Sequence, residues 1–223
     1  MGLVYRTLRG AATAALVGAL VACSDAPPPA AALPSGRETP LEGPLVVFLG
    51  DSLTAGYGLD ADQAFPALVG AELATEGSPV RIVNAGVSGD TSAGGLARLD
   101  WLLQQRPDLL VVGLGANDGL RGQPPEATEA NLVEIVRRAK GSGSKVLLLG
   151  MKVPPSYGPL YARQFERLYD RVADATDVPL MPFLLDGVAA RPELNLPDGI
   201  HPNADGHRIV AGNVARYVRD LVR

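Results

Sequence analysis

Residues 45–54 read LVVFLGDSLT, a run of five β-prone apolar residues followed by Gly-Asp-Ser. This order predicts a buried strand that ends in a sharp turn, with a helix starting after it. The first N–H groups of a helix have no partner within it and carry a partial positive charge, which suits an oxyanion that develops beside the serine. Ser52 is therefore a candidate nucleophile. On this stretch alone, an ordinary strand-to-helix turn with Ser52 as its cap remains the alternative.

The composition is that of one globular domain. The chain has 223 residues, of which 47% are hydrophobic and 20% charged, and this length allows a full core. A net charge of −4 without a Lys/Arg cluster argues against nucleic acid as a partner. The single cysteine allows no intramolecular disulfide, and His201 and His207 lack the spacing and partners of a metal site. We expect neither a metal nor a cofactor.

The N-terminal part of the chain predicts export and attachment to a membrane. Residues 1–22 carry two arginines ahead of an uncharged apolar run about as long as the hydrophobic part of a signal peptide. The run ends in Leu-Val-Ala before Cys23, which resembles the bacterial lipobox and implies a lipidated Cys23. Residues 23–44 are proline-rich like a tether, so the folded domain is expected over 45–223. We expect an exported protein anchored in the periplasm by its lipid, at the outer membrane; a plain secretory signal with an incidental cysteine is the alternative.

Apolar strands alternate with amphipathic helices through the rest of the chain. Strands are expected over 45–49, 80–83, 108–112, 145–149 and 178–181, and helices near 63–76, 96–103, 132–139, 161–172 and 210–221. This alternation predicts an α/β fold with a parallel sheet covered by helices on both faces. Three strands are followed by small polar clusters with glycine, at 50–52, 88–91 and 115–118. Because ligands bind at the carboxyl ends of parallel strands, the clusters predict one site at that edge.

The base for this site is expected near the C-terminus. Asp198 lies three residues before His201 in a loop that contains glycine and proline. At that spacing Asp198 can accept a hydrogen bond from Nδ1 of His201, which leaves Nε2 to take the Ser52 proton. An Asx-turn at Asp198 and a packing histidine ahead of a helix are the alternatives. His207 falls inside the last expected helix and is expected to be a structural or surface histidine.

Three groups are candidates for binding the oxyanion. They are the backbone N–H groups of Ser52 and Gly89 and the side-chain amide of Asn117. Glycine at position 89 lets the chain approach a substrate without a Cβ in the way. An ordinary turn glycine and an Asx-turn asparagine are the alternatives. Asp90 and Asp118 are expected to hold their own loops rather than to react.

Taken together, the motifs resemble the four blocks of the SGNH/GDSL hydrolase superfamily. The matching residues, in chain order, are Gly-Asp-Ser at 50–52, Gly89 within 88–91, Gly-x-Asn-Asp at 115–118 and Asp-x-x-His at 198–201. The runs 83–99, 117–122 and 198–203 are similar to the bacterial periplasmic thioesterase, lysophospholipase and arylesterase branch. The likeness covers about 45–223.

The resemblance implies a three-layer α/β/α sandwich with a flavodoxin-like parallel sheet. It implies Ser52 as nucleophile, Asp198 and His201 as the rest of a catalytic triad, and Ser52, Gly89 and Asn117 as the oxyanion hole. It also implies hydrolysis of small aryl or short-acyl esters or of lysophospholipids, and of thioesters in vitro. The leader departs from the pattern, because the best-known relatives carry an ordinary cleaved signal.

Other classes of protein fit the sequence less well. It contains neither the Gly-x-Ser-x-Gly pentad of α/β-hydrolases nor a Walker A motif, and the glycines at 113–115 lack the third glycine of the dinucleotide pattern. A carbohydrate acetylesterase of the same superfamily and a surface lipoprotein that binds without turnover remain alternatives. The loop 153–158 is apolar, and its Pro155 and Tyr157 are candidates to line an acyl groove, with ordinary loop packing as the alternative.

Overall fold

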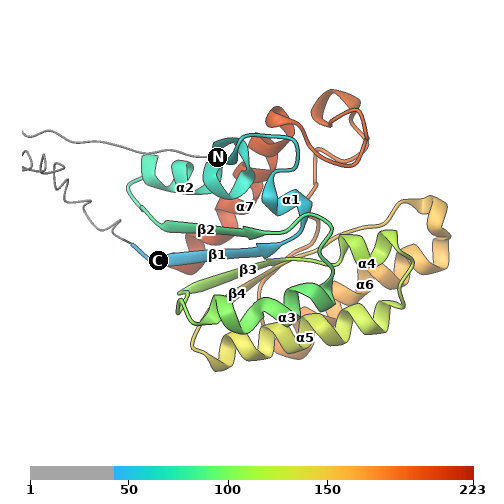
Figure 1. Ribbon diagram of the computed structural model, residues 1–223, viewed down its shortest axis with the longest axis horizontal. Helices are drawn as coiled ribbons and strands as arrows, with labels where there is room; N and C mark the ends of the chain where they lie inside the picture. Colours follow the sequence, from blue (N-terminus) through green and yellow to red (C-terminus); the bar gives the residue numbers. More distant parts are fainter. Residues whose placement is uncertain (1–42) are drawn as a thin grey trace, which may run out of the picture. The chain divides into compact units, whose positions relative to one another are not determined.

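The computed structural model describes residues 43–223, and its centre is a sheet of five parallel strands (Figure 1). The strands are β1 (Leu45–Gly50), β2 (Arg81–Gly86), β3 (Leu109–Gly113), β4 (Lys145–Leu149) and β5 (Leu180–Met181). They lie in the order β2-β1-β3-β4-β5, and every neighbouring pair is parallel. This order brings the carboxyl ends of β2, β1 and β3 side by side, which is where the three polar clusters begin.

Helices cover both faces of the sheet. They are α1 (Ser52–Ala55), α2 (Phe65–Thr75), α3 (Ser92–Leu103), α4 (Ala116–Leu120), α5 (Pro125–Gly141), α6 (Pro159–Thr176) and α7 (Ala204–Val222), with 3₁₀ turns η1 (Ala61–Gln63), η2 (Pro155–Tyr157) and η3 (Pro192–Leu194). Figure 1 shows α2 and α7 on one face and α3, α5 and α6 on the other. The predicted α/β/α sandwich is confirmed.

Apolar periodicity explains how the layers pack. Every residue of β1 and β3 is buried, as expected for central strands covered on both faces. In α5, the residues Leu132, Ile135, Val136 and Ala139 follow helical spacing and are all fully buried. Burying one such leucine or isoleucine side chain contributes about 1.5–3 kcal/mol, so this stripe fixes the helix against the sheet.

The edge strands differ from the sequence prediction. β2 was expected over 80–83 but runs to Gly86, which pairs with Gly50 of β1. β2 is an edge strand with partly exposed side chains, and its last residues are held by backbone pairing with β1 beyond the apolar run that predicted it. β5 is shorter than the expected 178–181, because Pro179 has no N–H to donate to a ladder. The short helix α4 was not predicted, and the helix expected over 63–76 is reduced to Phe65–Thr75 behind the 3₁₀ turn η1.

The expected leader falls outside this description. The signal over 1–22, the lipidated Cys23 and nearly all of the tether over 23–44 lie before the first described residue, Gly43. Within residues 43–223, no helix combines the length and the apolar character that crossing a bilayer requires.

Candidate active site

Ser52 lies in a tight turn at the carboxyl end of β1. Asp51 begins the turn and caps α1, because its side chain accepts the Leu53 N–H at 3.0 Å. Only glycine fits before it, since a Cβ at Gly50 would lie 1.9 Å from Thr54 Oγ1. The turn therefore positions the half-buried Ser52 at the edge where the strands end.

The imidazole of His201 joins Ser52 to Asp198. Its Nε2 lies 2.9 Å from Ser52 Oγ, and its Nδ1 lies 2.7 Å from Asp198 Oδ2. With the Nδ1 proton held by the carboxylate, Nε2 can accept the proton of the hydroxyl. The structure thus brings together a serine and a histidine that are 149 residues apart in the chain.

The second oxygen of Asp198 binds the backbone of its own loop. Oδ1 accepts the N–H of Ile200 at 2.9 Å and that of His201 at 3.0 Å. These bonds lower the pKa of Asp198 to about 2, with the His201 backbone and side chain contributing most and the Ile200 backbone next. The carboxyl group is therefore ionised at neutral pH and faces Nδ1 of the imidazole.

Backbone hydrogen bonds join the two ends of the loop that carries Asp198 and His201. Leu196 donates its N–H to the His201 carbonyl at 2.7 Å, and Asn195 and Pro202 form an antiparallel bridge. Gly199 turns the chain with φ of 69°, a left-handed conformation that glycine adopts without a Cβ penalty. The loop therefore has a defined shape although half of it faces solvent.

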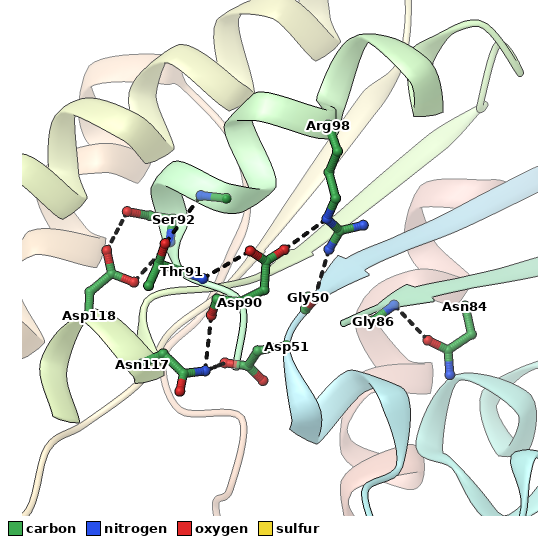
Figure 2. A network of polar contacts seen from close by, with 11 residues as sticks. Gly50, Asp51, Asn84, Gly86, Asp90, Thr91, Ser92, Arg98, Asn117 and Asp118 are labelled. Carbon is green, nitrogen blue, oxygen red and sulfur yellow. Dashed lines mark hydrogen bonds and ion pairs between the residues drawn. The ribbon is translucent and has the colours of Figure 1, made fainter. Parts of the chain in front are cut away.

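Two candidate oxyanion donors follow β2 and β3. Gly89 has φ of 81° in the loop after β2, and Asn117 lies in α4, whose N-cap is Gly115 with φ of 111°. Nδ2 of Asn117 donates to the Asp90 carbonyl at 3.0 Å and lies 3.4 Å from Asp51 Oδ2 (Figure 2). The first bond fixes the orientation of the amide. The second is too long to be strong, so one N–H remains available to a substrate oxygen.

A salt bridge ties the Gly89 loop to the strand that carries the serine. Arg98, on α3, donates its Nε to Asp90 Oδ2 at 2.8 Å and a terminal nitrogen to the Gly50 carbonyl at 3.0 Å (Figure 2). The other oxygen of Asp90 accepts the Thr91 N–H at 3.1 Å. The ends of β1 and β2 are thus linked through one guanidinium group.

A buried network attaches the Asn117 helix to α3. Asp118 accepts the backbone N–H of Ser92 at 2.9 Å, the Ser92 hydroxyl at 2.5 Å and the Thr128 hydroxyl at 3.3 Å. Asn131 donates in turn to the Ser92 hydroxyl at 2.9 Å. Asp118 is 1% exposed and fully bonded, so it holds its loop, as the sequence predicted for this residue and for Asp90.

Asp51 is a second carboxyl group close to the site. Its pKa is raised to about 6, mainly because it is buried, against a lowering by the Leu53 backbone N–H and the nearby His201. A charge on Asp51 would oppose an oxyanion bound at Asn117. That opposition weakens as the pH falls to about 6, where Asp51 takes up a proton.

His207 has a structural place, as the sequence predicted. It is buried in α7, where its Nδ1 accepts the N–H of Phe65 at 3.0 Å and its ring stacks on the Phe65 ring. Burial lowers the pKa of His207 to about 4, so the ring is neutral when it accepts this bond. The contact satisfies the first N–H of α2 and fastens α2 to α7.

The two candidate groove residues lie in η2, after β4. Tyr157 donates its hydroxyl to the Leu120 carbonyl at 2.9 Å, which brings the loop against the end of α4. Pro155 is exposed beside it. The structure thus places this loop next to the helix of Asn117.

Sequence reasoning missed one residue of the site, Tyr57. Its ring lies over the His201 imidazole, with centroids 4.5 Å apart and planes inclined by 36°. A signal for it exists in the glycines on either side, Gly56 and Gly58, which suggest a turn, but the direction of the side chain depends on the folded loop.

Outside the site, a cavity of about 580 Å³ near the end of β5 is lined by Lys152, Phe183 and Tyr217, among others, and by none of the predicted site residues. Within residues 43–223, no three His, Cys, Asp or Glu side chains are grouped so that they could hold a metal ion.

A parallel α/β sheet with a serine, histidine and aspartate in hydrogen-bonded series at its carboxyl edge defines a serine hydrolase. Residues 48–209 match the model of the GDSL-like lipase/acylhydrolase family, and the chain belongs to that family. Its chemistry is that of a serine esterase.

Named relatives agree with this assignment. The chain is 48% identical to "Esterase TesA" of Pseudomonas aeruginosa over 70% of this chain and 79% of the relative. It is 41% identical to an "Arylesterase" of Vibrio mimicus over 77% and 86%, and 42% identical to "Thioesterase 1/protease 1/lysophospholipase L1" of Escherichia coli K12 over 79% and 84%. The crystal structure titled TesA superposes with a TM-score of 0.77 at 44% identity, over 79% of this chain and 99% of that one.

Proposed function

We propose that this protein hydrolyses small aryl and short-acyl esters and lysophospholipids, with Ser52 as nucleophile, His201 as base and Asp198 as its partner. The observation that carries the assignment of roles is the continuous hydrogen-bonded series from Ser52 Oγ through the imidazole to Asp198, at 2.9 and 2.7 Å. Thioesters undergo the same acyl transfer and are further substrates.

The proposed reaction has two halves. Ser52 Oγ attacks the carbonyl carbon while its proton passes to Nε2 of His201, and the carbonyl oxygen gains the negative charge. The N–H groups of Ser52 and Gly89 and the amide of Asn117 bind that oxygen. The imidazolium then gives its proton to the departing alcohol or thiol, and the acyl group stays on Ser52. Water repeats these steps to release the acid.

Apolar side chains near the reacting groups support an acyl or aryl substrate. Three of them are about half exposed. Ile200, which precedes His201 in the chain, is 47% exposed, and Tyr57, whose ring contacts His201, is 51% exposed. Val87, in the loop of Gly89, is 48% exposed. An acyl or aryl group that covers these side chains would remove their apolar area from water. The names of the relatives, which include an arylesterase and a lysophospholipase, favour the same class.

Labelling with a fluorophosphonate tests the nucleophile. The folded protein should carry one adduct, on Ser52, by peptide mass spectrometry, because only an activated hydroxyl attacks the reagent quickly. Ser52→Ala should abolish labelling, and Ser142→Ala, an exposed serine after α5, should not. An unlabelled wild-type protein would favour a lipoprotein that binds without turnover.

A substrate panel tests the class of ester. We expect p-nitrophenyl esters of short chains and lysophosphatidylcholine to be hydrolysed, and acetylated xylan to be a poor substrate. Preference for the xylan would favour the carbohydrate acetylesterase alternative. If Pro155 and Tyr157 line the acyl groove, Tyr157→Ala should change the chain-length preference more than it changes turnover of the acetyl ester.

We also propose that the protein is exported and held in the periplasm by a lipid on Cys23, at the outer membrane. The apolar run within 1–22 and the Leu-Val-Ala sequence before Cys23 support this, with 23–44 as the tether. Cys23→Ala should move the protein from the membrane fraction to the soluble fraction. Unchanged membrane association would contradict lipidation.

A further inference from the structure

The side chain of Tyr57 makes a contact that the proposed reaction does not use. Its ring lies against the ring of His201, with centroids 4.5 Å apart, although the residue is 51% exposed. Among the aromatic pairs of residues 43–223, this is the one that involves His201. An aromatic face at this distance attracts a cation.

The backbone holds Tyr57 in place from the serine side. The N–H groups of Gly56 and Tyr57 both donate to the Ser52 carbonyl, at 3.1 and 3.0 Å. Gly56 and Gly58 have φ of 76° and 79°, so the chain turns sharply on either side of the tyrosine. The position of Tyr57 is therefore fixed relative to the nucleophile.

The same turn also packs against the loop that carries the base. A Cβ on Gly58 would lie 2.9 Å from Leu196 Cδ1, so this contact is close. Leu196 in turn donates its N–H to the His201 carbonyl at 2.7 Å. The turn over 56–58 thus spans the gap between the serine and the base, and the Tyr57 ring covers the base from that turn.

We infer that Tyr57 is a positioning residue for the base: its ring fixes the plane of the His201 imidazole and stabilises the positive charge that the imidazole gains from the Ser52 proton. The inference rests on the proposed function for its catalytic meaning. When Oγ forms its bond to the carbonyl carbon, the proton moves to Nε2 and the imidazole, whose centroid lies 4.5 Å from that of the tyrosine ring, becomes positively charged. Uncharged imidazole gains less from that face, so the contact favours the charged intermediate over the resting state.

Several other groups act on the imidazole, and a test must separate them from Tyr57. On its own loop, Asp198 holds Nδ1 at 2.7 Å. From the start of α1, the buried carboxyl of Asp51 interacts with the ring through its charge. From α7, the buried His207 lies close enough for the charge of His201 to add to the lowering of the His207 pKa that burial causes. These three remain unchanged when only the tyrosine ring is removed.

The test replaces the ring and follows the base itself. Tyr57→Leu and Tyr57→Met remove the aromatic face, Tyr57→Phe keeps it, and Trp101→Leu, which removes a 66% exposed aromatic from α3, is the control. The chain has only two histidines, so imidazole NMR signals of His201 and His207 can be followed separately against pH. Steady-state kcat and KM for p-nitrophenyl acetate are measured over the same pH range.

We expect Tyr57→Leu and Tyr57→Met to move the His201 titration and the acid limb of kcat to lower pH by about half a unit, because the charged ring loses its support. We expect kcat to fall about threefold with a smaller change in KM, since the loss falls on the charged state. Tyr57→Phe should keep the His201 titration of the wild type, Trp101→Leu should match the wild type in both measurements, and the His207 titration should not move.

Three results would overturn the inference. An unmoved His201 titration in both aliphatic variants would show that the ring does not stabilise the charge. A change in KM alone would make Tyr57 a substrate contact. If Tyr57→Phe behaved like Tyr57→Leu, the hydroxyl rather than the ring face would matter. The NMR titration decides the contact even if no ester is hydrolysed, so failure of the proposed function is distinguishable.

Discussion

Asn117 keeps its amide in place with one short bond to the Asp90 carbonyl and leaves its second N–H close to Asp51, at 3.4 Å. An amide already oriented before substrate arrives costs little reorganisation when negative charge appears. Its neighbour Asp118 fixes the same helix from the buried side. In the proposed reaction Asn117 binds the negative charge, and the adjacent Asp118 supports the backbone of the same helix.

Asn117→Ala should lower kcat by about 100- to 1000-fold and change KM little, because the lost bond forms with the oxyanion rather than with the bound ester. Steady-state kinetics on p-nitrophenyl acetate measure both constants. Asn213→Ala removes an amide that donates to the Asp186 carbonyl on the surface and serves as the control. A large rise in KM with unchanged kcat would remove Asn117 from the oxyanion hole.

Asp51 should make the protein less stable as the pH rises. Its pKa is about 6 in the folded protein against an ordinary 3.8, so the unfolded chain releases this proton first. Between about pH 4 and 6 the folded state binds more protons, and the free energy of unfolding therefore falls with rising pH, by up to about 3 kcal/mol. Above the pKa that Asp51 has in the folded protein, the loss of stability has reached its full size.

Asp51→Asn should abolish this part of the pH dependence, because an amide can still accept the Leu53 N–H but does not ionise. Urea denaturation at pH 4 and pH 7 should show that the variant gains stability over the wild type at pH 7 and little at pH 4. Asp62→Asn, at an exposed position in η1, is the matched control. If Asp51→Asn changed the free energy of unfolding equally at pH 4 and pH 7, a raised pKa of Asp51 in the folded protein would be contradicted.

At the scale of elements, the site depends on side chains that join strand ends. Arg98 connects α3 to the ends of β1 and β2, and Asp118 connects α4 to α3. Strand pairing alone fixes the strands but not the loops that follow them. These polar links therefore set the relative positions of Ser52, Gly89 and Asn117.

Arg98→Ala should lower stability by about 1–3 kcal/mol, because it leaves the mostly buried Asp90 carboxylate without its partner. It should also reduce kcat, since the Gly89 loop and the Asn117 acceptor lose their shared support. Arg138→Ala removes an exposed i,i+4 pair with Glu134 and should change stability far less, because solvent screens that pair. Chemical denaturation and steady-state kinetics measure the two effects. Equal effects of both changes would contradict a special role for Arg98.

The sequence predicts the centre of the fold better than its edges. The all-apolar runs that form β1 and β3 identify central strands, and the glycine-bearing clusters after them indicate one catalytic edge. The extension of β2 to Gly86 depends on pairing with β1, which no residue pattern encodes. Likewise, the Arg98 link to the Gly50 carbonyl and the Tyr57 contact with His201 depend on how loops distant in sequence meet.

At the scale of the whole domain, the two ends of the described chain lie at the edge opposite Ser52. Pro44 lines the same cavity, of about 400 Å³, as Leu221 and Val222 at the end of α7. Figure 1 shows the C-terminus beside the start of β1, whereas Ser52 follows the end of β1. A polypeptide joined before Gly43 therefore enters far from the reacting groups.

Replacing residues 1–42 by an unrelated soluble domain should leave kcat/KM for p-nitrophenyl acetate unchanged to within about twofold, as for a surface change away from the site. The same domain inserted between Gly122 and Gln123, in the loop after α4, is the contrasting variant and should reduce activity strongly. If the protein with the replaced N-terminal segment and the protein with the insertion after Gly122 were equally active, the placement of the site at one edge of the sheet would be contradicted.

Asp198 and His201 lie on one loop, which the Asn195–Pro202 bridge closes. A slow movement of that loop would therefore carry both residues together away from the Ser52 hydroxyl. On gentle warming, activity should then be lost because this loop moves away from Ser52 while the rest of the domain stays folded. Circular dichroism should still report a folded sheet at that temperature, and hydrolysis should return on cooling. Crosslinking the loop to the turn over 56–58 should raise the temperature at which hydrolysis stops without raising the melting temperature by the same amount.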